Sequence, residues 1–163
     1  MKKTFVIFLT AICILLIAAL TVLFFVEDGV TDISVKTGSA DEIVLELKYL
    51  FPTGGYSVRQ VPETEGENTG NGMTEYDGSL GKYRMLISFG DMDLSEDLMN
   101  RFPVGQVVSL TDSSASVQVK RVHLNDHGFD LYIGFDSPIS IESVSRGEMN
   151  PIGGKMQIPV TLR

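Results

Sequence analysis

Five acidic side chains in one polar segment are the residues of this chain that most resemble a binding site. Pro62 to Leu80 reads PETEGENTGNGMTEYDGSL, and its carboxylates belong to Glu63, Glu65, Glu67, Glu75 and Asp77. Carboxylate oxygens suit calcium, but the twelve-residue spacing of a calcium loop is absent, so these acids are weak candidates for a cation site. The glycines and the scarcity of apolar residues predict a flexible loop. A loop of about 19 residues is typical of a functional or a mobile connection.

Two other sets of residues imitate catalytic or metal-binding motifs. Ser79 and Lys82 spell S-x-x-K, and residues 36–38 spell KTG, both signatures of serine acyl-transfer enzymes. In those enzymes the serine opens a helix and KTG follows it, whereas here the serine lies in the loop and KTG precedes it. His123 and His127 would share a helix face, but they fall on an expected strand and its turn. We therefore expect no catalytic site, no metal site and no cofactor.

The N-terminal region predicts a membrane anchor. Phe5 to Val26 is an uncharged apolar run of 22 residues, preceded by two lysines and followed by an acidic pair. Such a run is long enough to cross a hydrocarbon core of about 30 Å, and the flanking charges orient residues 1–4 toward the cytoplasm. The expectation is a single-pass protein of the cytoplasmic (inner) membrane with an extracytoplasmic C-terminal part. A cleaved signal peptide is the alternative.

Charge and cysteine content limit the partners of the remaining chain. Cys13 is the only cysteine and lies in the apolar run, so no disulfide is expected beyond it. Two of the 13 Lys and Arg precede the run, leaving 11 against 21 Asp and Glu and a net charge near −10. This excess argues against nucleic acid as a partner and favours a soluble surface. We expect a connector over 27–38 and one domain over 39–163.

Residues 41–51 can be interpreted as a helix or a strand. Ser39 and Glu42 form the S-x-x-E pattern of a capping box, and the apolar residues that follow share one helical face. The same stretch alternates as Ile43, Leu45 and Leu47, which indicates a strand. The helix leaves fewer apolar residues on the wrong face and is favoured, and the strand stays open.

The rest of the chain predicts a mainly-β domain. A short helix is expected within residues 91–102, capped by Asp93 and ended by Pro103. Alternating apolar segments separated by turn residues predict an antiparallel barrel or sandwich, with one or two short helices in total. The expected strands are 33–35, 56–61, 83–89, 106–111, 116–124, 129–136, 139–144 and 156–162.

The corner that follows the short helix is expected to be structural. A helix that ends at Phe102 and a strand that opens at Val104 must turn sharply around Pro103. Phe102 continues the apolar face of the helix and is expected to be buried. Gly105 is expected to adopt a backbone conformation that other residues avoid. We therefore interpret the corner as part of the fold and not as a binding site.

Residues 83–162 resemble a known domain. They read as a strand, a short acidic helix, a V-G-Q-x-V strand at 104–108 and a closing IGGKMQIPVTL at 152–162. This order resembles the β-barrel domain of periplasmic adaptor (membrane-fusion) subunits of bacterial efflux and secretion systems. It also resembles an uncharacterised single-span envelope family of unknown function. A complete adaptor is excluded, because the chain has no room for lipoyl-like halves or a long α-hairpin.

The resemblance implies a function class. It implies a membrane-anchored, non-enzymatic envelope component, an accessory or adaptor subunit of a transport, secretion or polysaccharide-export assembly. Its partners would then be the membrane and other envelope proteins, with homo-oligomerisation left open. The alternative is an extracytoplasmic ligand- or cation-binding module that uses the 62–80 loop as its mouth.

Overall fold

The computed structural model describes residues 7–17, 29–39, 41–50, 54–68, 72–123, 128–141 and 153–163. Residues 7–17 form a helix with exposed side chains. The expected cytoplasmic residues 1–4, the ends of the apolar run at 5–6 and 18–26, and the first connector residues lie outside the described ranges. So do residues 124–127 and 142–152, which include His127 and the C-terminal ends of the strands expected at 116–124 and 139–144.

The predicted membrane-spanning helix is wrong for the described part of the chain. None of the helices in the described ranges has the length and the apolar character that crossing a bilayer requires.

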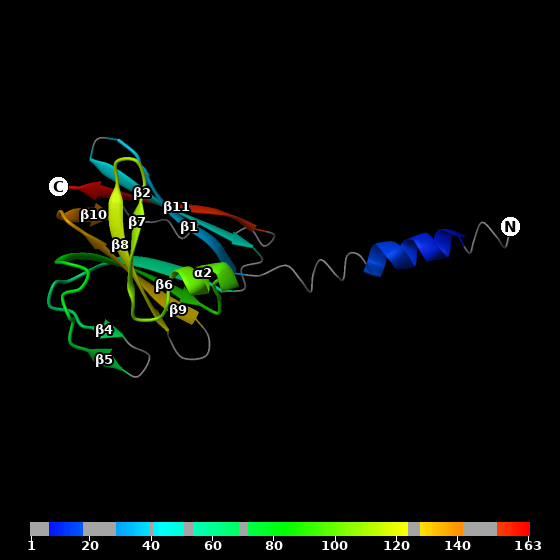
Figure 1. Cartoon of the computed structure of the whole chain (residues 1–163), viewed down its shortest axis with the longest axis horizontal. Coiled ribbons are helices and arrows are strands. Elements are labelled where there is room, and N and C mark those ends of the chain that lie inside the picture. Colours follow the sequence, from blue (N-terminus) through cyan, green and yellow to red (C-terminus); the bar gives the residue numbers. More distant parts are fainter. Residues whose placement is uncertain are drawn as a thin grey trace.

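Two antiparallel sheets and a small ribbon make up the domain (Figure 1). The four-stranded sheet has the order β1-β2-β11-β10, with bounds Gly29–Thr37, Glu42–Leu50, Gly153–Leu162 and Ile139–Ile141. The five-stranded sheet has the order β3-β6-β9-β8-β7, with bounds Tyr56–Val61, Tyr83–Gly90, Gly128–Phe135, Ser116–His123 and Val107–Thr111. The ribbon consists of β4 (Glu67–Asn68) and β5 (Met73–Thr74).

The mainly-β prediction is confirmed, and its barrel alternative is wrong. In the described residues β1 lies beside β7 and β10 lies beside β3, but neither pair forms a ladder, so both sheets stay open. The inner faces of the two sheets instead pack on each other through one apolar core. Residues at every second position supply it, including Ile33, Leu45 and Ile158 from one sheet and Met85 and Leu131 from the other. The arrangement is a β-sandwich.

Residues 42–50 form a strand, so the favoured helix is wrong. Ile43, Leu45, Leu47 and Tyr49 are all buried at period two in β2. Pairing explains the choice, because β2 lies between β1 and β11 and both of its edges are hydrogen-bonded. The capping-box contact does form, since the Ser39 amide donates to the Glu42 carboxylate at 3.4 Å, but it closes the β1–β2 turn.

The short helix α2 (Glu96–Arg101) closes one end of the sandwich (Figure 1). Its cap is Ser95, whose side chain accepts a hydrogen bond from the Leu98 amide, so Asp93 as the predicted cap is wrong. The reason is tertiary: residues 93–95 pair with β1, where the Val30 amide donates to the Asp93 carbonyl and the Ser95 amide to the Val30 carbonyl. This pairing delays the helix by two residues.

Strand β9 is buried along its whole length, on both faces. Its inner face meets the four-stranded sheet. Its outer face lies under the segment that joins β3 to β6, which runs from Pro62 to Lys82 and includes the β4–β5 ribbon. That covering segment positions the candidate site.

Candidate functional site

A buried arginine attaches the covering segment to the five-stranded sheet. Arg84 projects from the outer face of β6 and is fully buried. Its Nη2 donates to the carbonyls of Pro62, Glu63 and Glu65 at 3.1, 3.3 and 2.6 Å. The Tyr76 ring stacks on the guanidinium at 3.6 Å. Arg84 therefore binds both ends of the segment and satisfies carbonyls that burial would otherwise leave unpaired.

A small apolar cluster seals the segment on the sheet. Val61, Leu80, Leu86, Val122 and Tyr132 pack together with Tyr76 on the outer face. Leu80 approaches β9 at Gly134, where an added Cβ would lie 2.2 Å from the Leu80 carbonyl oxygen. The Asn68 amide donates to the Tyr132 hydroxyl at 3.1 Å. Thus the predicted loop contains a ribbon and buried contacts, while its mobility stays a prediction.

Lys120 is the charged centre of the site. It projects from the outer face of β8, and only 9% of its side chain is exposed. Its ammonium donates to Glu67 Oε2 at 2.6 Å, to Asp77 Oδ2 at 3.1 Å and to Ser79 Oγ at 3.5 Å. Glu67 is buried as deeply, and its other oxygen, Oε1, has no partner among the described residues. The two shortest hydrogen bonds of the Lys120 ammonium therefore go to carboxylates of the protein itself.

The pKa values of this cluster favour its charged form. Burial alone would lower the pKa of Lys120, but the bonds to Glu67 and Asp77 outweigh burial and raise it. The Asp77 carboxylate accepts bonds from the Ser79 side chain and amide and then from Lys120, which together lower its pKa to about 2. Lys120 and Asp77 are therefore both ionised near neutral pH.

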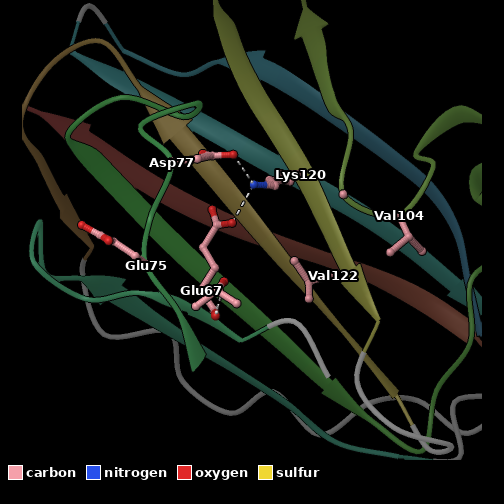
Figure 2. A pocket seen from close by; sticks show the side chains of 8 residues that line it. Glu67, Glu75, Asp77, Val104, Lys120 and Val122 are labelled. Atoms are coloured by element: carbon pink, nitrogen blue, oxygen red, sulfur yellow. Dashed lines mark hydrogen bonds and ion pairs between the residues drawn. The ribbon is translucent and has the colours of Figure 1, made fainter. Parts of the chain in front are cut away.

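An open cavity of about 290 Å³ lies beside this cluster (Figure 2). Figure 2 shows Glu67 and Asp77 converging on Lys120 from the covering segment, while the Glu75 carboxylate points away from Lys120. The aliphatic wall consists of Val122 on β8 and Val104 at the corner. Gly105 and Thr74 complete the lining. The size is near the lower end of small-molecule sites, so the cavity fits a small ligand or a single side chain.

The cluster is poorly suited to nucleophilic catalysis. A serine beside a lysine can react when the lysine is neutral and accepts the hydroxyl proton. Here the raised pKa of Lys120 keeps it protonated, and Ser79 accepts a hydrogen bond from it instead of donating one. Lys82, the lysine of the S-x-x-K pattern, instead pairs with Glu63, with 3.6 Å between its ammonium nitrogen and a carboxylate oxygen. Lys36 of the KTG motif pairs with Glu46 on the other sheet.

The structure separates most of the acidic residues that the sequence suggested as cation ligands. Glu63 faces Lys82, Glu65 forms a bidentate pair with Arg59, and Glu75 is exposed. Only Glu67 and Asp77 come together, and a lysine lies between them. In the described ranges no group of three or more His, Cys, Asp or Glu could hold a metal ion. His123 is the last residue of β8.

The predicted corner is buried on one side and borders the cavity on the other. Phe102 is fully buried in the main core. Gly105 has φ +75°, and its amide donates to the Arg121 carbonyl at 2.8 Å. The burial and the backbone conformation are as expected, but Val104 and Gly105 also line the cavity, so the corner is placed to contact a ligand.

Sequence reasoning missed Arg84, Lys120 and Tyr132. One signal was available: Leu86, Val122 and Tyr132 are apolar or aromatic residues at the outward positions of their strands, opposite the inward alternation of Met85, Val119 and Ile133. Apolar residues on both faces indicate that both faces are covered. The only long segment left to provide the second cover was 62–80.

Comparison with known proteins adds no family: no protein-family model matches this chain, and neither a curated protein nor a solved structure matches it.

Proposed function

We propose that this chain is a non-enzymatic binding module that takes a small organic ligand into the cavity between the 62–80 segment, β8 and the Val104–Gly105 corner. The observation that carries the proposal is the lining itself. A buried, prearranged Lys120–Glu67 pair faces two valines in one cavity of about 290 Å³. Ligand sites commonly combine apolar walls with a few fixed polar groups in this way.

A fragment screen by amide NMR on the full-length chain tests the proposal. Ligands should shift the amides of residues 72–77, 104–105 and 120–122 together. Val104→Phe should then abolish binding, because Val104 is about half exposed and lines the cavity. Val107→Phe is the matched control, since Val107 is also exposed but does not line the cavity. Equal binding by both variants, or no fragment that shifts these amides, would refute the proposal.

The accessory or adaptor subunit is a second candidate, favoured by two exposed valines. Val107 is the first residue of β7, the last strand in the order of its sheet, and Val104 lies in the corner three residues before it. Exposed apolar residues at a sheet edge are a common protein contact. Val107→Lys should remove partner proteins that co-purify with the chain in mild detergent and leave fragment binding intact. Unchanged co-purification would exclude this contact.

Deleting residues 63–77 is a poor way to separate the two candidates. The deletion would remove Glu67 and Tyr76 and leave Arg84 and Lys120 buried without their partners. We expect such a protein to lose stability whichever function is correct. The single-residue variants above avoid this ambiguity.

A further inference from the structure

The unmatched polar groups of the cavity indicate which ligand chemistry it prefers. Lys120 already donates to two carboxylates and approaches Ser79, so little of its donor capacity is left for a ligand anion. Glu67 is 3% exposed and lines the cavity, and its Oε1 accepts no hydrogen bond from the described residues. The lining contains three carboxylates, of Glu67, Glu75 and Asp77, and one ammonium, of Lys120. The surplus is therefore an acceptor with negative charge.

The shape of the lining restricts the ligand further. In Figure 2 the Glu67 carboxylate stands among the lining side chains, with Val122 and Val104 on the same side of it as Lys120 and on the opposite side from Glu75. A ligand that reaches Glu67 would lay its neighbouring atoms along these valines. An apolar stem suits that wall, and a charged donor suits the buried carboxylate oxygen, because an unpaired buried carboxylate oxygen is costly.

We propose that the cavity binds an alkylammonium group, with Glu67 as the acceptor of its N–H and the valines as the seat of its aliphatic stem. The inference rests on the proposed function and narrows it to one ligand class. The group has two sources, a free aliphatic amine or the lysine side chain of a peptide.

The first test uses the full-length protein and three probes of four carbon atoms each. These are n-butylammonium, n-butanol and butyrate, titrated by amide NMR at pH 7. The ammonium should bind at least about tenfold more tightly than the alcohol, the usual gain for a charge-assisted bond to a buried carboxylate. Butyrate should be the weakest. Equal binding of the ammonium and the alcohol, or tighter binding of butyrate, would overturn the inference.

A pair of matched variants tests the role of Glu67. Glu67→Gln and Glu75→Gln remove the same charge from the same lining, but only Glu67 lies against Lys120, and the Glu75 carboxylate points away. Glu67→Gln should lower the affinity for n-butylammonium about tenfold and leave the affinity for n-butanol unchanged. Glu75→Gln should change either affinity by less than about threefold. Similar losses in both variants would show long-range attraction only and would overturn the assigned acceptor. Amide spectra that superimpose outside the cavity verify that each variant is folded. If Glu67→Gln proves to be unfolded, the titrations of the three probes on the wild type still decide the ligand class.

A further arm distinguishes the two sources of the group. Nα-acetyl-lysine methylamide that binds more tightly than n-butylammonium would support a lysine side chain, and 1,4-diaminobutane that binds more tightly than both would support a free amine. If the screen finds neutral or anionic fragments at residues 104–122 but no ammonium binds, the inference fails while the proposed function stands. If nothing binds there, both fail.

Discussion

Removal of Lys120 should show how strongly the covering segment depends on one buried ion pair. In Lys120→Met the stem is kept and the charge is lost, so Glu67, with only 4% of its side chain exposed, stays buried without a counter-ion. Breaking one side of a buried pair typically costs about 3 to 5 kcal/mol of unfolding free energy. Asp77 adds little to this figure, because 59% of its side chain is exposed and its attraction is screened.

Replacing both residues measures the net contribution of the ion pair to the unfolding free energy, without the cost of leaving one charge buried and unpaired. At the 2.6 Å distance between Lys120 Nζ and Glu67 Oε2, an effective dielectric constant near 20 gives an attraction of about 6 kcal/mol. Desolvation of the two ions costs several kcal/mol each and offsets most of this attraction. Glu67→Met combined with Lys120→Met should therefore lie within about 2 kcal/mol of the wild type.

Urea unfolding followed by circular dichroism measures all four proteins of this cycle. The expected coupling free energy is at least about 2 kcal/mol, the range found for contacting residues. If the two single losses simply add in the double variant, the pair contributes nothing that depends on both partners and the reasoning is refuted.

The pH dependence of stability gives a second readout. Because the folded pKa of Lys120 is raised above 10.5, its contribution is complete below that pH and is lost as pH rises through the folded value. Lys120→Met should lack this alkaline loss.

Three further predictions concern other parts of the fold. Phe102→Ala should lower the unfolding free energy by about 3 to 5 kcal/mol, since the ring is fully buried; a variant that unfolds at the wild-type urea concentration would show that the ring does not pack as described. Gly105→Ala should cost about 1 to 2 kcal/mol from its φ of +75° alone, because nothing lies within 4 Å of the added Cβ. Gly90→Ala is its control, with equally open space and no left-handed backbone, and equal losses in both would exclude backbone strain as the cause. Hydrogen bonds from Lys155, Lys36 and Gln157 lower the pKa of Glu46 to about 2, so its contribution to stability is present above pH 4.5 and is lost as pH falls toward 2. Glu46→Gln should therefore lose less stability than the wild type between about pH 4.5 and 2. Identical urea midpoints of variant and wild type across that window would contradict this.

The local signals in the sequence were sufficient for the strands that alternate between the core and solvent. Residues 107–111 and 116–123 form strands close to their predicted bounds, because Leu110, Val117 and Val119 turn inward at period two whatever partner they meet. The burial of Phe102 followed in the same way from its position after Leu98 on one helical face. Such patterns depend only on neighbouring residues and are visible without a tertiary structure.

Where two local patterns competed, the pairing partner decided. Residues 39–50 contain both a capping box with a helical apolar face and the alternation of a strand. The helix fits the apolar residues slightly better, but β2 is a strand because β1 and β11 take up both of its edges. The first helical residue after Asp93 was likewise set by β1, which holds residues 93–95 in extended pairing. The sequence contains both options, and the choice depends on residues far away along the chain.

The candidate site was decided almost entirely by tertiary structure. Glu67 lies 53 positions and Asp77 lies 43 positions before Lys120 in the sequence, and no spacing rule connects these charged residues. The acidic residues of 62–80 suggested a cation site as a group, but folding pairs Glu63 with Lys82 and Glu65 with Arg59 and brings two others to Lys120. Composition determines how many charges a segment carries. Which charge meets which partner, and how little water reaches it, depends on the segment folding back over the outer face of the sheet, because only burial turns a weak surface attraction into a strong and specific pair.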